Sequence, residues 1–289
     1  MSAHTGVGFV PTKRYDTYPA IDPIKSTLTG KVVLITGASR GIGRPMAIAF
    51  AQAAVSGLVL LARSDTATTE AACLAAQRPG HSLKVLTLAV DITNLEQVSD
   101  AARRVEEMFG RLDVIINNAG YADPWKTMGE TDPNEWWRTW EVNMRGTFNV
   151  THAFLPLLTK CGGDRTIMNL VSAAAHWAIK HCSAYQTSKF ALMRFTELLM
   201  EDHGDQGVLA YAVHPCATPT DMNADLPEEV KKRLIDTPEL AAHSIVWLAR
   251  ERREWLGGRY VSTQWDVDEL LQKTQEIVKG DKLKFRMVV

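Results

Sequence analysis

Four polar residues have the types and the spacing needed for proton transfer to an oxygen atom. Tyr185 and Lys189 are four positions apart in a segment of helical character, so their side chains share one face of that helix. Ser172 precedes Tyr185 by thirteen residues, after an apolar run typical of a strand, and Asn143 belongs to the preceding helical segment. A phenol, an ammonium and a hydroxyl brought together can bind a carbonyl oxygen and protonate it.

Each of these residues also has an ordinary structural interpretation when it is taken alone. Tyr185 suits the core face of an amphipathic helix, Lys189 a charged surface, Ser172 a cap, and Asn143 a polar bend in a helix. For an arbitrary tyrosine and lysine at this spacing, the structural interpretation is much the commoner one. The catalytic interpretation therefore depends on other motifs and on the elements that carry these residues.

A glycine-rich turn indicates a second chemistry, the binding of phosphate groups. The turn follows an apolar run at residues 32–36 and contains Gly37, Ser39, Arg40, Gly41, Ile42 and Gly43. Glycines allow a tight turn and close approach to a pyrophosphate, and the helix that follows offers free N–H groups and its positive dipole end. The spacing differs from Gly-x-Gly-x-x-Gly, so a plain strand-to-helix turn is the alternative. Its place after the first strand favours a dinucleotide site.

Charged residues near this turn indicate which dinucleotide fits. Arg63 follows the second apolar run, where an acidic residue would bind the ribose 2′-hydroxyl, and Arg40 lies in the nearby turn. Two guanidinium groups favour a 2′-phosphate, and hence NADPH over NADH. The alternative is that Arg63 is a solvated surface charge. Asp91, after the third apolar run, is expected either to bind the adenine amino group or to cap the helix that starts at Leu95.

The elements that must position these residues alternate along the chain. Apolar runs typical of buried parallel strands occupy residues 32–36, 58–62, 84–89, 114–116, 165–171, 208–213 and 259–261. Helical segments occupy residues 45–54, 67–77, 95–109, 135–159, 184–202 and 238–250. Strand and helix in alternation predict a doubly wound parallel α/β sheet with helices on both faces. Residues 46–62 lack charge, but we interpret them as a buried helix followed by a strand, not a membrane span.

Composition excludes several classes of function. The 289 residues carry a formal net charge of -1, with 46% hydrophobic and 22% charged residues, so nucleic acid and anionic membranes are not expected partners. Four well-separated cysteines and the absence of a clustered Cys/His motif predict free thiols and no metal site. Residues 1–10 do not have the pattern of a secretory signal, and we expect a reducing, cytoplasmic setting.

Taken together, the motifs resemble those of the short-chain dehydrogenase/reductase family over about residues 31–262. The shared marks are Thr36–Gly43, Asn117-Asn118-Ala119-Gly120, Asn143, Ser172, Tyr185-x3-Lys189, and Pro215 with Thr220, in the order and spacing of the family. The resemblance implies a single Rossmann-type catalytic domain. Residues 1–30, which contain three prolines, look like an extended N-terminal arm, and the charged residues 263–289 look like a C-terminal tail. Arm and tail look like those of fungal members, many of which serve natural-product pathways.

The resemblance also implies roles for individual residues. Asn143, Ser172, Tyr185 and Lys189 would form the catalytic tetrad. The cofactor would contact the glycine turn, Arg63, Asp91, Tyr185, Lys189 and the residues Asn118, Ala119, Gly120, Pro215, Thr218 and Thr220, with Thr220 at the nicotinamide carboxamide. This chain departs from the family at Cys216, where a glycine usually follows the proline, and that leaves the contacts at this position open.

Carbonyl reduction assigns a task to each member of the tetrad. Tyr185 would protonate the substrate oxygen, and the charge of Lys189, aided by the oxidised nicotinamide, would lower the phenol pKa. Ser172 would hydrogen-bond the substrate oxygen, Lys189 the nicotinamide ribose, and Asn143 a water that resupplies the proton. Two alternatives stay open from sequence: a non-redox cyclase or dehydratase that retains the cofactor, and a dinucleotide sensor without turnover.

The substrate is expected at loops beyond the carboxyl ends of the strands, residues 121–131, 173–183 and 217–234. These loops contain the bulky, mostly apolar side chains Trp125, His176, Trp177, Ile179, Met222 and Leu226, which favour a hydrophobic or aromatic ketone. Residues 227–233 are expected to form a mobile helical lid. The family resemblance implies a homodimer or homotetramer formed through the helices that carry Asn143 and Tyr185.

Overall fold

A single seven-stranded parallel sheet forms the centre of the protein. The computed structural model describes residues 6–287, so residues 1–5 of the expected arm and 288–289 of the expected tail lie outside it. The strands lie in the order β3-β2-β1-β4-β5-β6-β7. Their bounds are β1 Val32–Thr36, β2 Gly57–Ala62, β3 Lys84–Ala89, β4 Val114–Asn117, β5 Thr166–Leu170, β6 Leu209–His214 and β7 Tyr260–Ser262. All seven predicted strands are present, within one residue at each end.

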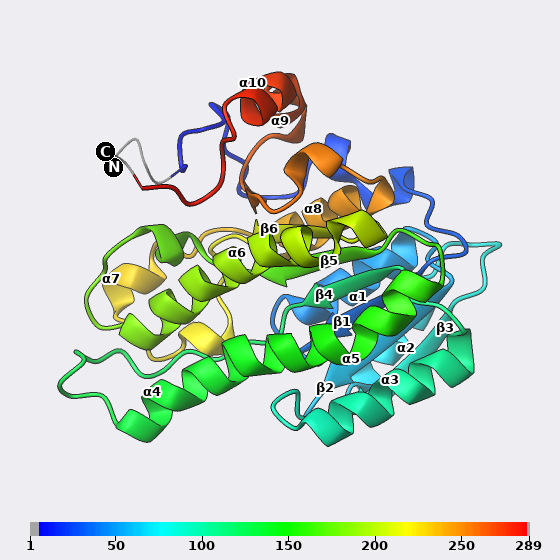
Figure 1. Ribbon diagram of the computed structural model, residues 1–289, viewed down its shortest axis with the longest axis horizontal. Coiled ribbons are helices and arrows are strands. Elements are labelled where there is room, and N and C mark those ends of the chain that lie inside the picture. The colour runs from blue at the N-terminus through cyan, green and yellow to red at the C-terminus, as the bar shows by residue number, and fades with distance from the viewer. Residues whose placement is uncertain (1–5, 288–289) are drawn as a thin grey trace.

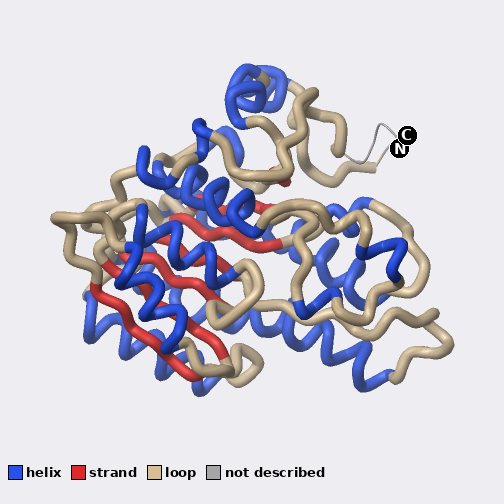
Figure 2. The backbone as a smooth tube through the Cα atoms, turned by 180° about the vertical axis from the view of Figure 1, so that it is seen from behind, coloured by secondary structure: helices blue, strands red, loops and turns tan. Residues whose placement is uncertain are grey.

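Helices cover both faces of the sheet (Figures 1 and 2). On one face α1 (Gly43–Gln52) contacts both α2 (Ala67–Ala76) and α8 (Pro238–Arg250). On the other face α3 (Leu95–Phe109) packs against α5 (Thr147–Lys160), and α6 (Ser183–His203) follows alongside. The predicted Rossmann-type, doubly wound architecture is therefore confirmed.

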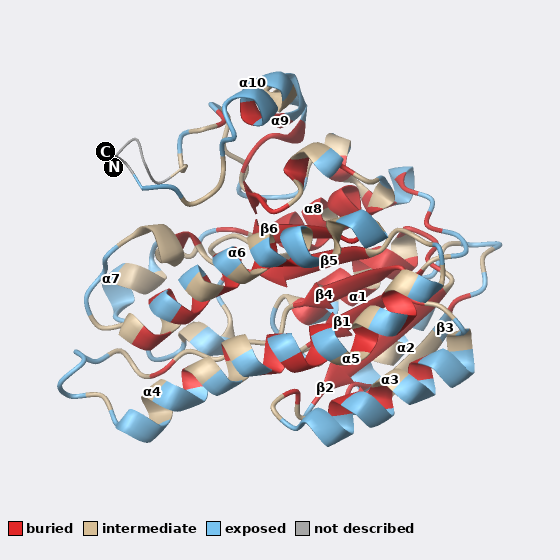
Figure 3. Ribbon diagram, viewed as in Figure 1, coloured by how far each residue is buried: buried red, intermediate tan, exposed pale blue. Residues whose placement is uncertain are grey.

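The strands are buried on both faces, as their continuous apolar runs predict. Every residue of β1 and β2 is buried, whereas β3 at the edge of the sheet is mostly half-buried, with only Lys84 and Ala89 exposed (Figure 3). The uncharged stretch at residues 46–62 forms the body of α1 and then β2, with Met46 and Phe50 fully buried in the core. Within residues 6–287, none of the helices has the length and apolar character that crossing a bilayer requires.

The order of the strands predicts a ligand-binding crevice at the carboxyl ends of β1 and β4. These two strands are neighbours, but the chain leaves β1 toward β2 on one side and leaves β4 toward β5 on the other. Connections that diverge in this way open a space above the strand ends, which is where open α/β sheets bind ligands. The glycine turn after β1 and the segment after β4 both lie at this point.

The helical segment predicted at residues 135–159 is one long helix interrupted by a wider turn. It comprises α4 (Pro133–Trp140), a π-helical turn (Glu141–Gly146) and α5. Asn143, fully buried, lies in the middle of the π turn. Such π turns are often found at functional sites, because they project a side chain that a regular helix would direct elsewhere.

The arm and the tail pack against each other and against α8 (Figures 1 and 2). Lys13 pairs with Trp265 as an antiparallel bridge, and the guanidinium of Arg14 lies 2.6 Å from a carboxylate oxygen of Asp266. The arm is less extended than expected, because prolines start two short 3-10 turns, Pro19–Ile21 and Pro23–Lys25. The tail forms two short helices, α9 (Val267–Gln272) and α10 (Thr274–Lys279).

Candidate active site

The structure brings the four residues of the expected tetrad to the carboxyl-end edge of the sheet. Ser172 follows β5 and begins a 3-10 turn, Ala173–His176, that contacts α6. Tyr185 and Lys189 lie in the first two turns of α6, and the π turn that holds Asn143 also contacts α6. Four residues separated by up to 46 positions in sequence therefore share one region of the fold.

Lys189 is buried directly beside Tyr185. Only 4% of Lys189 is exposed, and its Nζ lies 5.8 Å from the centroid of the Tyr185 ring. The ammonium donates a hydrogen bond of 2.8 Å to the carbonyl oxygen of Leu170, the last residue of β5. Burial lowers the pKa of Lys189 to about 8, because removal from water disfavours its charged form.

Ser172 and Tyr185 are also close, but the pKa of the phenol shifts upward. Burial raises the pKa of Tyr185 above its ordinary value of 10.0, while a hydrogen-bonding contact with Ser172 lowers it. Burial is the largest of these influences on the pKa of Tyr185. The lowering of this pKa by Lys189 together with the oxidised nicotinamide stays a prediction. The Ser172 hydroxyl also accepts a 3.1 Å hydrogen bond from the N–H of Ala174. Ser172 is therefore a cap for its turn as well as a neighbour of Tyr185.

Asn143 connects the loop after β4 to the catalytic helix. Its side-chain oxygen accepts from the N–H of Tyr121 at 2.9 Å, and its Nδ2 donates to the carbonyl oxygen of Tyr121 at 2.9 Å. The same Nδ2 donates to the Ser188 hydroxyl at 3.0 Å, and that hydroxyl donates to the carbonyl oxygen of Tyr185 at 2.8 Å. These bonds fix the position of α6 relative to the loop.

The glycine turn and the segment after β4 form one continuous unit. Gly37 has φ +67, and a Cβ on it would lie 2.9 Å from the Cα of Ala119. The Thr36 hydroxyl accepts from the N–H groups of Asn118 and Ala119 at 3.0 and 2.9 Å. A Cβ on Gly120 would lie 3.6 Å from the Lys189 ammonium nitrogen, so this segment reaches from the glycine turn to the tetrad.

The first turn of α1 offers free donors for an anion. Ile42 precedes this ten-residue helix and provides no side-chain cap for it. In the described part of the chain, the N–H groups at its start therefore have no side-chain acceptor, as in phosphate-binding turns. A Cβ on Gly43 would lie 2.7 Å from the side-chain nitrogen of Asn118, so a larger residue would close the turn. The backbone thus fits the pyrophosphate of a dinucleotide.

The two arginines expected at the 2′-phosphate lie in different surroundings. Arg40 forms an ion pair of 2.8 Å with Asp221, and both side chains are about 70% exposed (69% and 71%). Arg63 is exposed at the end of β2 and has no ion-pair partner within residues 6–287. Burial would raise the pKa of Asp91, but hydrogen bonds from Thr93 and the charge of Arg63 lower it overall.

Asp91 is not the cap of the helix that begins at Leu95. Its carboxylate accepts from the N–H and the hydroxyl of Thr93 at 2.9 and 2.8 Å. The N-terminal cap of α3 is Asn94, whose side-chain oxygen accepts from the N–H of Gln97 at 3.1 Å. Of the two interpretations of Asp91, the cap is wrong, and the contact with adenine stays a prediction.

The segment after β6 carries the departure from the family pattern. Cys216 has φ +91, a conformation in which a residue with a Cβ is strained and which glycine adopts freely. Its thiol lies 2.8 Å from the Thr218 hydroxyl. Further along, Thr220 lies over the glycine turn, with its methyl carbon 3.9 Å from a Cβ placed on Gly41. Thr220 therefore borders the glycine turn, whereas contacts of Pro215 and Thr218 with a cofactor stay a prediction.

The expected substrate loops differ in how they are packed. Met222 faces the tetrad region, since its terminal carbon lies 3.5 Å from a Cβ placed on Gly120. His176 instead packs against Tyr260 and Phe285, with ring centroids 4.5 and 5.0 Å apart. Burial lowers its pKa to about 4, so it is neutral near pH 7 and does not act as a second acid there. The expected lid contains a short helix, α7 (Glu228–Lys231).

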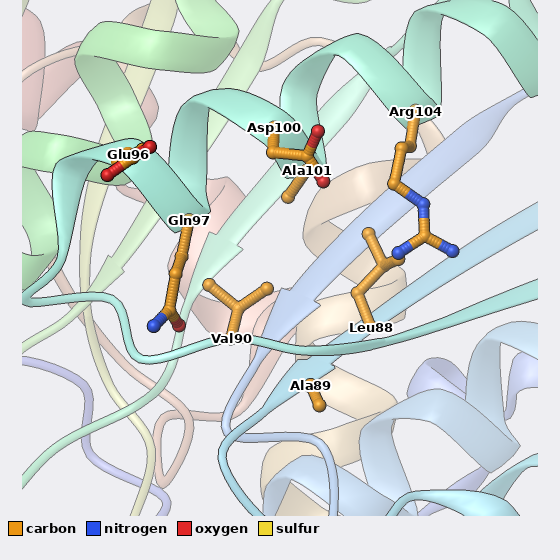
Figure 4. Close-up of a pocket in the computed structure, with 8 residues that line it drawn as sticks. All are labelled: Leu88, Ala89, Val90, Glu96, Gln97, Asp100, Ala101 and Arg104. Carbon is orange, nitrogen blue, oxygen red and sulfur yellow. The ribbon is translucent and has the colours of Figure 1, made fainter.

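A separate cavity of about 270 Å³ lies between β3 and α3 at the edge of the sheet (Figure 4). It is lined by Leu88, Ala89, Val90, Glu96, Gln97, Asp100, Ala101 and Arg104. None of the tetrad lines this cavity, and its carboxylates and guanidinium come from one exposed helix face. We therefore place the chemistry in the crevice at the strand ends.

Several residues near the tetrad were not singled out from sequence. Asp123, on the loop after β4, is only 8% exposed, and Ser188 bridges Asn143 to α6. The Tyr121 hydroxyl donates to a carboxylate oxygen of Glu135 on α4. In the sequence, Asp123 could have been noticed because its carboxylate follows Gly120, at the end of the Asn-Asn-Ala-Gly motif, by three residues. The contacts of Ser188 and Glu135 depend on the packing of distant segments.

Fold and crevice together define a Rossmann-type α/β protein with a dinucleotide-binding turn and a serine, a tyrosine and a lysine beside it. The family model for short chain dehydrogenases matches residues 31–231. The chain is 48% identical over 286 residues to the short chain dehydrogenase mpl6 of Monascus purpureus, covering 98% of both chains. It is 38% identical to andI of Emericella variicolor, another protein described as a short chain dehydrogenase, covering 97% of both chains. The protein therefore belongs to the short chain dehydrogenase family.

Solved structures agree with this assignment. A protein of Shigella flexneri 2a, described as a short chain dehydrogenase and complexed with NADP, superimposes with a TM-score of 0.72 at 25% identity. That alignment covers 83% of this chain and 99% of the other. The oxidoreductase yciK from E. coli has a TM-score of 0.73 at 25% identity, over 86% and 98% of the two chains.

Proposed function

We propose that the protein is an NADPH-dependent reductase that converts a ketone into an alcohol, with residues 31–262 as its catalytic domain. The observation that carries this proposal is the convergence of Tyr185, Lys189 and Ser172 next to Gly120. Gly120 belongs to the segment that is hydrogen-bonded to the glycine turn through Thr36. A proton donor and a dinucleotide site thus share one crevice.

The residues of the crevice fit a phosphorylated dinucleotide. The uncapped start of α1 and the crowded glycines would hold the pyrophosphate. Among residues 6–287 the Arg63 guanidinium has no ion-pair partner, and it follows β2 at the corner where a 2′-phosphate is expected. Arg40 can leave its exposed pair with Asp221 at little cost. The NADP bound to the Shigella relative supports the same preference. When bound, NADPH supplies the hydride that is added to the carbonyl carbon.

The side chains of the tetrad handle the proton and the charge on oxygen. The Tyr185 hydroxyl donates its proton to the substrate oxygen, and a phenol with a raised pKa stays protonated until that transfer. The Lys189 ammonium, held 5.8 Å from the ring, stabilises the phenolate left behind. The Ser172 hydroxyl hydrogen-bonds the substrate oxygen. Asn143 holds the loop and helix together through Tyr121 and Ser188, and we assign it the nearby proton-supplying water.

The loops around the crevice favour a bulky, hydrophobic or aromatic ketone. Met222 lies near Gly120, and the ring of Trp125 packs against that of His181 in a tilted arrangement, with 5.6 Å between the centroids. Apolar walls with few polar groups bind substrates by burial of hydrocarbon and aromatic surface. We infer a role in secondary metabolism, because the arm and the tail resemble those of fungal members and the relatives mpl6 and andI are themselves fungal short chain dehydrogenases.

We also infer a homodimer or homotetramer formed through α4, α5 and α6. Trp137 on α4 is 61% exposed, and Phe148 on α5 is 49% exposed. Large apolar side chains exposed on neighbouring helices are typical of interfaces between subunits. The four cysteines are free thiols, which agrees with a reducing compartment such as the cytoplasm.

The experiment that tests this function follows the absorbance of NADPH with a panel of aromatic and polyketide-like ketones, with product analysis in parallel. A reductase consumes one NADPH for each alcohol formed, and it prefers NADPH to NADH. Product formed without net consumption of NADPH would instead indicate a non-redox enzyme. Binding of NADPH without turnover of any ketone would indicate a sensor, and either result would contradict the proposal.

A further inference from the structure

Asp236 is a buried residue that joins the two ends of a long loop. The loop occupies residues 217–236, between β6 and α8, and Asp236 is only 2% exposed. One of its carboxylate oxygens accepts a hydrogen bond of 2.6 Å from the N–H of Ala217. In return, the N–H of Asp236 donates to the carbonyl oxygen of Ala217 at 3.2 Å. The first and last residues of the loop are therefore held together by two bonds.

The arm and the tail bind to the same point. The side-chain nitrogen of Gln264 donates to the same carboxylate oxygen at 2.8 Å, and the N–H of Arg14 donates to the carbonyl oxygen of Gln264 at 2.8 Å. The next residue, Thr237, donates its N–H to the carbonyl oxygen of Tyr15 at 2.9 Å and its hydroxyl to the Asp16 carboxylate at 2.6 Å. Arm and tail, which lie outside the residues 31–231 matched by the family model, thus hold the base of the loop.

A strained residue lies immediately before the loop. Cys216 has φ +91, and its thiol donates to the carbonyl oxygen of Thr237 at 3.9 Å. Strained backbone persists only where the surrounding structure holds it in place. The peptide N–H that follows Cys216 is the one bound by Asp236. The carboxylate therefore acts on the segment in which the chain departs from the family pattern.

The far part of the loop lies over the proposed cofactor site. The methyl carbon of Thr220 lies 3.9 Å from a Cβ placed on Gly41, and the terminal carbon of Met222 lies 3.5 Å from a Cβ placed on Gly120. An ion pair joins the loop to the glycine turn here, but both of its side chains are exposed, and exposed pairs contribute little. The positions of Thr220 and Met222 therefore depend on the buried bonds at the base.

We propose that Asp236 is a positioning residue that fixes the base of the loop at residues 217–236 and thereby holds Thr220 and Met222 against the cofactor and the ketone. Tyr185 and Lys189 belong to α6, so the role concerns binding and not proton transfer. The inference deepens the proposed reductase function and rests on it for its kinetic readout. A second readout, limited proteolysis of the loop, does not require turnover.

The variants separate the bonds of the carboxylate from its charge. Asp236→Ala removes the accepting oxygen, whereas Asp236→Asn loses the charge and keeps one oxygen for both donors. The matched control is Glu239→Ala. Glu239 is exposed in the first turn of α8, and within residues 6–287 its carboxylate accepts no bond from either end of the loop. If Asp236→Ala does not fold, Gln264→Ala, which removes one of the two donors, takes its place.

The first readout is the rate of cleavage by trypsin under native conditions, with the cut sites identified by mass spectrometry. Lys232 and Arg233 are exposed in the loop and provide the sites. We expect cleavage there to be about tenfold faster in Asp236→Ala and about threefold faster in Gln264→Ala, because lost bonds at the base make local opening easier. Asp236→Asn should stay within about threefold of the wild type, and Glu239→Ala should match it. General unfolding would instead produce cuts throughout the chain.

The second readout is cofactor binding and steady-state kinetics with NADPH and a ketone. We expect Asp236→Ala to raise the dissociation constant of NADPH and the KM for the ketone about five- to tenfold, and to keep kcat within about threefold, because the loop contacts the binding site and not the phenol. Asp236→Asn should remain within about twofold of the wild type in all three quantities.

Two results would overturn the proposal. One is cleavage of the loop at the wild-type rate in Asp236→Ala, or in Gln264→Ala where that variant takes its place. The other is a loss of kcat with unchanged KM and unchanged NADPH affinity. A wild-type protein that neither binds NADPH nor reduces a ketone contradicts the proposed function alone, since the rate of cleavage still decides whether Asp236 holds the loop.

Discussion

The ammonium nitrogen of Lys189 lies 5.8 Å from the centroid of the Tyr185 ring, one helical turn further along α6. The same nitrogen donates to the carbonyl oxygen of Leu170 at 2.8 Å, so the charge is held in place by the end of β5. Burial lowers its pKa from 10.5 to about 8. A lysine held in this way can change its charge within the pH range in which enzymes are assayed.

The first prediction is that ketone reduction slows as the pH rises through about 8. Above that value the ammonium loses its proton, and the phenolate formed on Tyr185 loses the charge that stabilises it. The measurement is kcat/KM for the ketone between pH 6 and 10, in steps of half a unit. A rate that stays constant to pH 10 would show that the charge of Lys189 is not required.

Titration of Lys189 does not itself destabilise the fold at high pH, because its linkage to stability has the opposite sign. Its pKa is lower in the folded protein than the ordinary 10.5, so the unfolded chain binds more protons between about 8 and 10.5. The contribution of Lys189 to the free energy of unfolding therefore increases as the pH rises through this window. Circular dichroism at each pH value provides the control.

The second prediction concerns cofactor preference. Arg63→Ala should weaken NADPH binding about 10- to 100-fold and leave NADH binding nearly unchanged, because one charge-assisted hydrogen bond to the 2′-phosphate contributes about 1.5–3 kcal/mol. Titration of cofactor fluorescence measures both affinities. Arg103→Ala, on the exposed face of α3 where it pairs with Asp100 and Glu107, is the matched control. Equal losses for the two cofactors would remove Arg63 from the 2′-phosphate site.

The third prediction tests the strained backbone at Cys216. Cys216→Ala keeps the Cβ at φ +91 and loses the sulfur, whereas Cys216→Gly loses the sulfur and the strain together. The glycine variant should therefore be more stable than the alanine variant by about 1–2 kcal/mol. Urea unfolding of the two variants gives this difference directly. An alanine variant at least as stable as the glycine variant would mean that the residue is not strained.

The fourth prediction concerns stability in acid. Burial lowers the pKa of His176 from 6.5 to about 4, so the unfolded chain binds a proton more readily and stability falls as the pH drops from about 6.5 to 4. His176→Phe removes this titration and keeps an aromatic ring against Tyr260 and Phe285. Its acid unfolding midpoint should move down by about half a pH unit. His152→Phe, at an exposed position on α5, should not show this shift.

Most of the fold could be predicted because the information is local. The central strands are continuous apolar runs, and the helix at residues 95–109 is bounded by Asn94, whose side chain caps it, and by Gly110, which has φ +64. Both signals belong to neighbouring residues in sequence. The sequence also predicts that Tyr185 and Lys189 lie on the same face of their helix, because residues four positions apart in a helix share a face.

The features that sequence did not indicate depend on contacts between distant segments. The π turn at Asn143 accompanies hydrogen bonds to Tyr121, and its segment looks like a regular helix in sequence. Arg40 pairs with Asp221, 181 residues away, where the sequence suggested only a phosphate contact. The raised pKa of Tyr185 results from burial, which is a property of the assembled fold.

Replacement of a single hydroxyl tests the central claim most directly. Tyr185→Phe should retain the wild-type affinity for NADPH and lose kcat for ketone reduction by about 100-fold or more, since a positioned general acid contributes about 10²–10⁴. Tyr121→Phe, which removes a hydroxyl bonded to Glu135 on the same side of the crevice, should lose far less. Turnover by Tyr185→Phe at the wild-type rate, with the cofactor bound, would contradict the account.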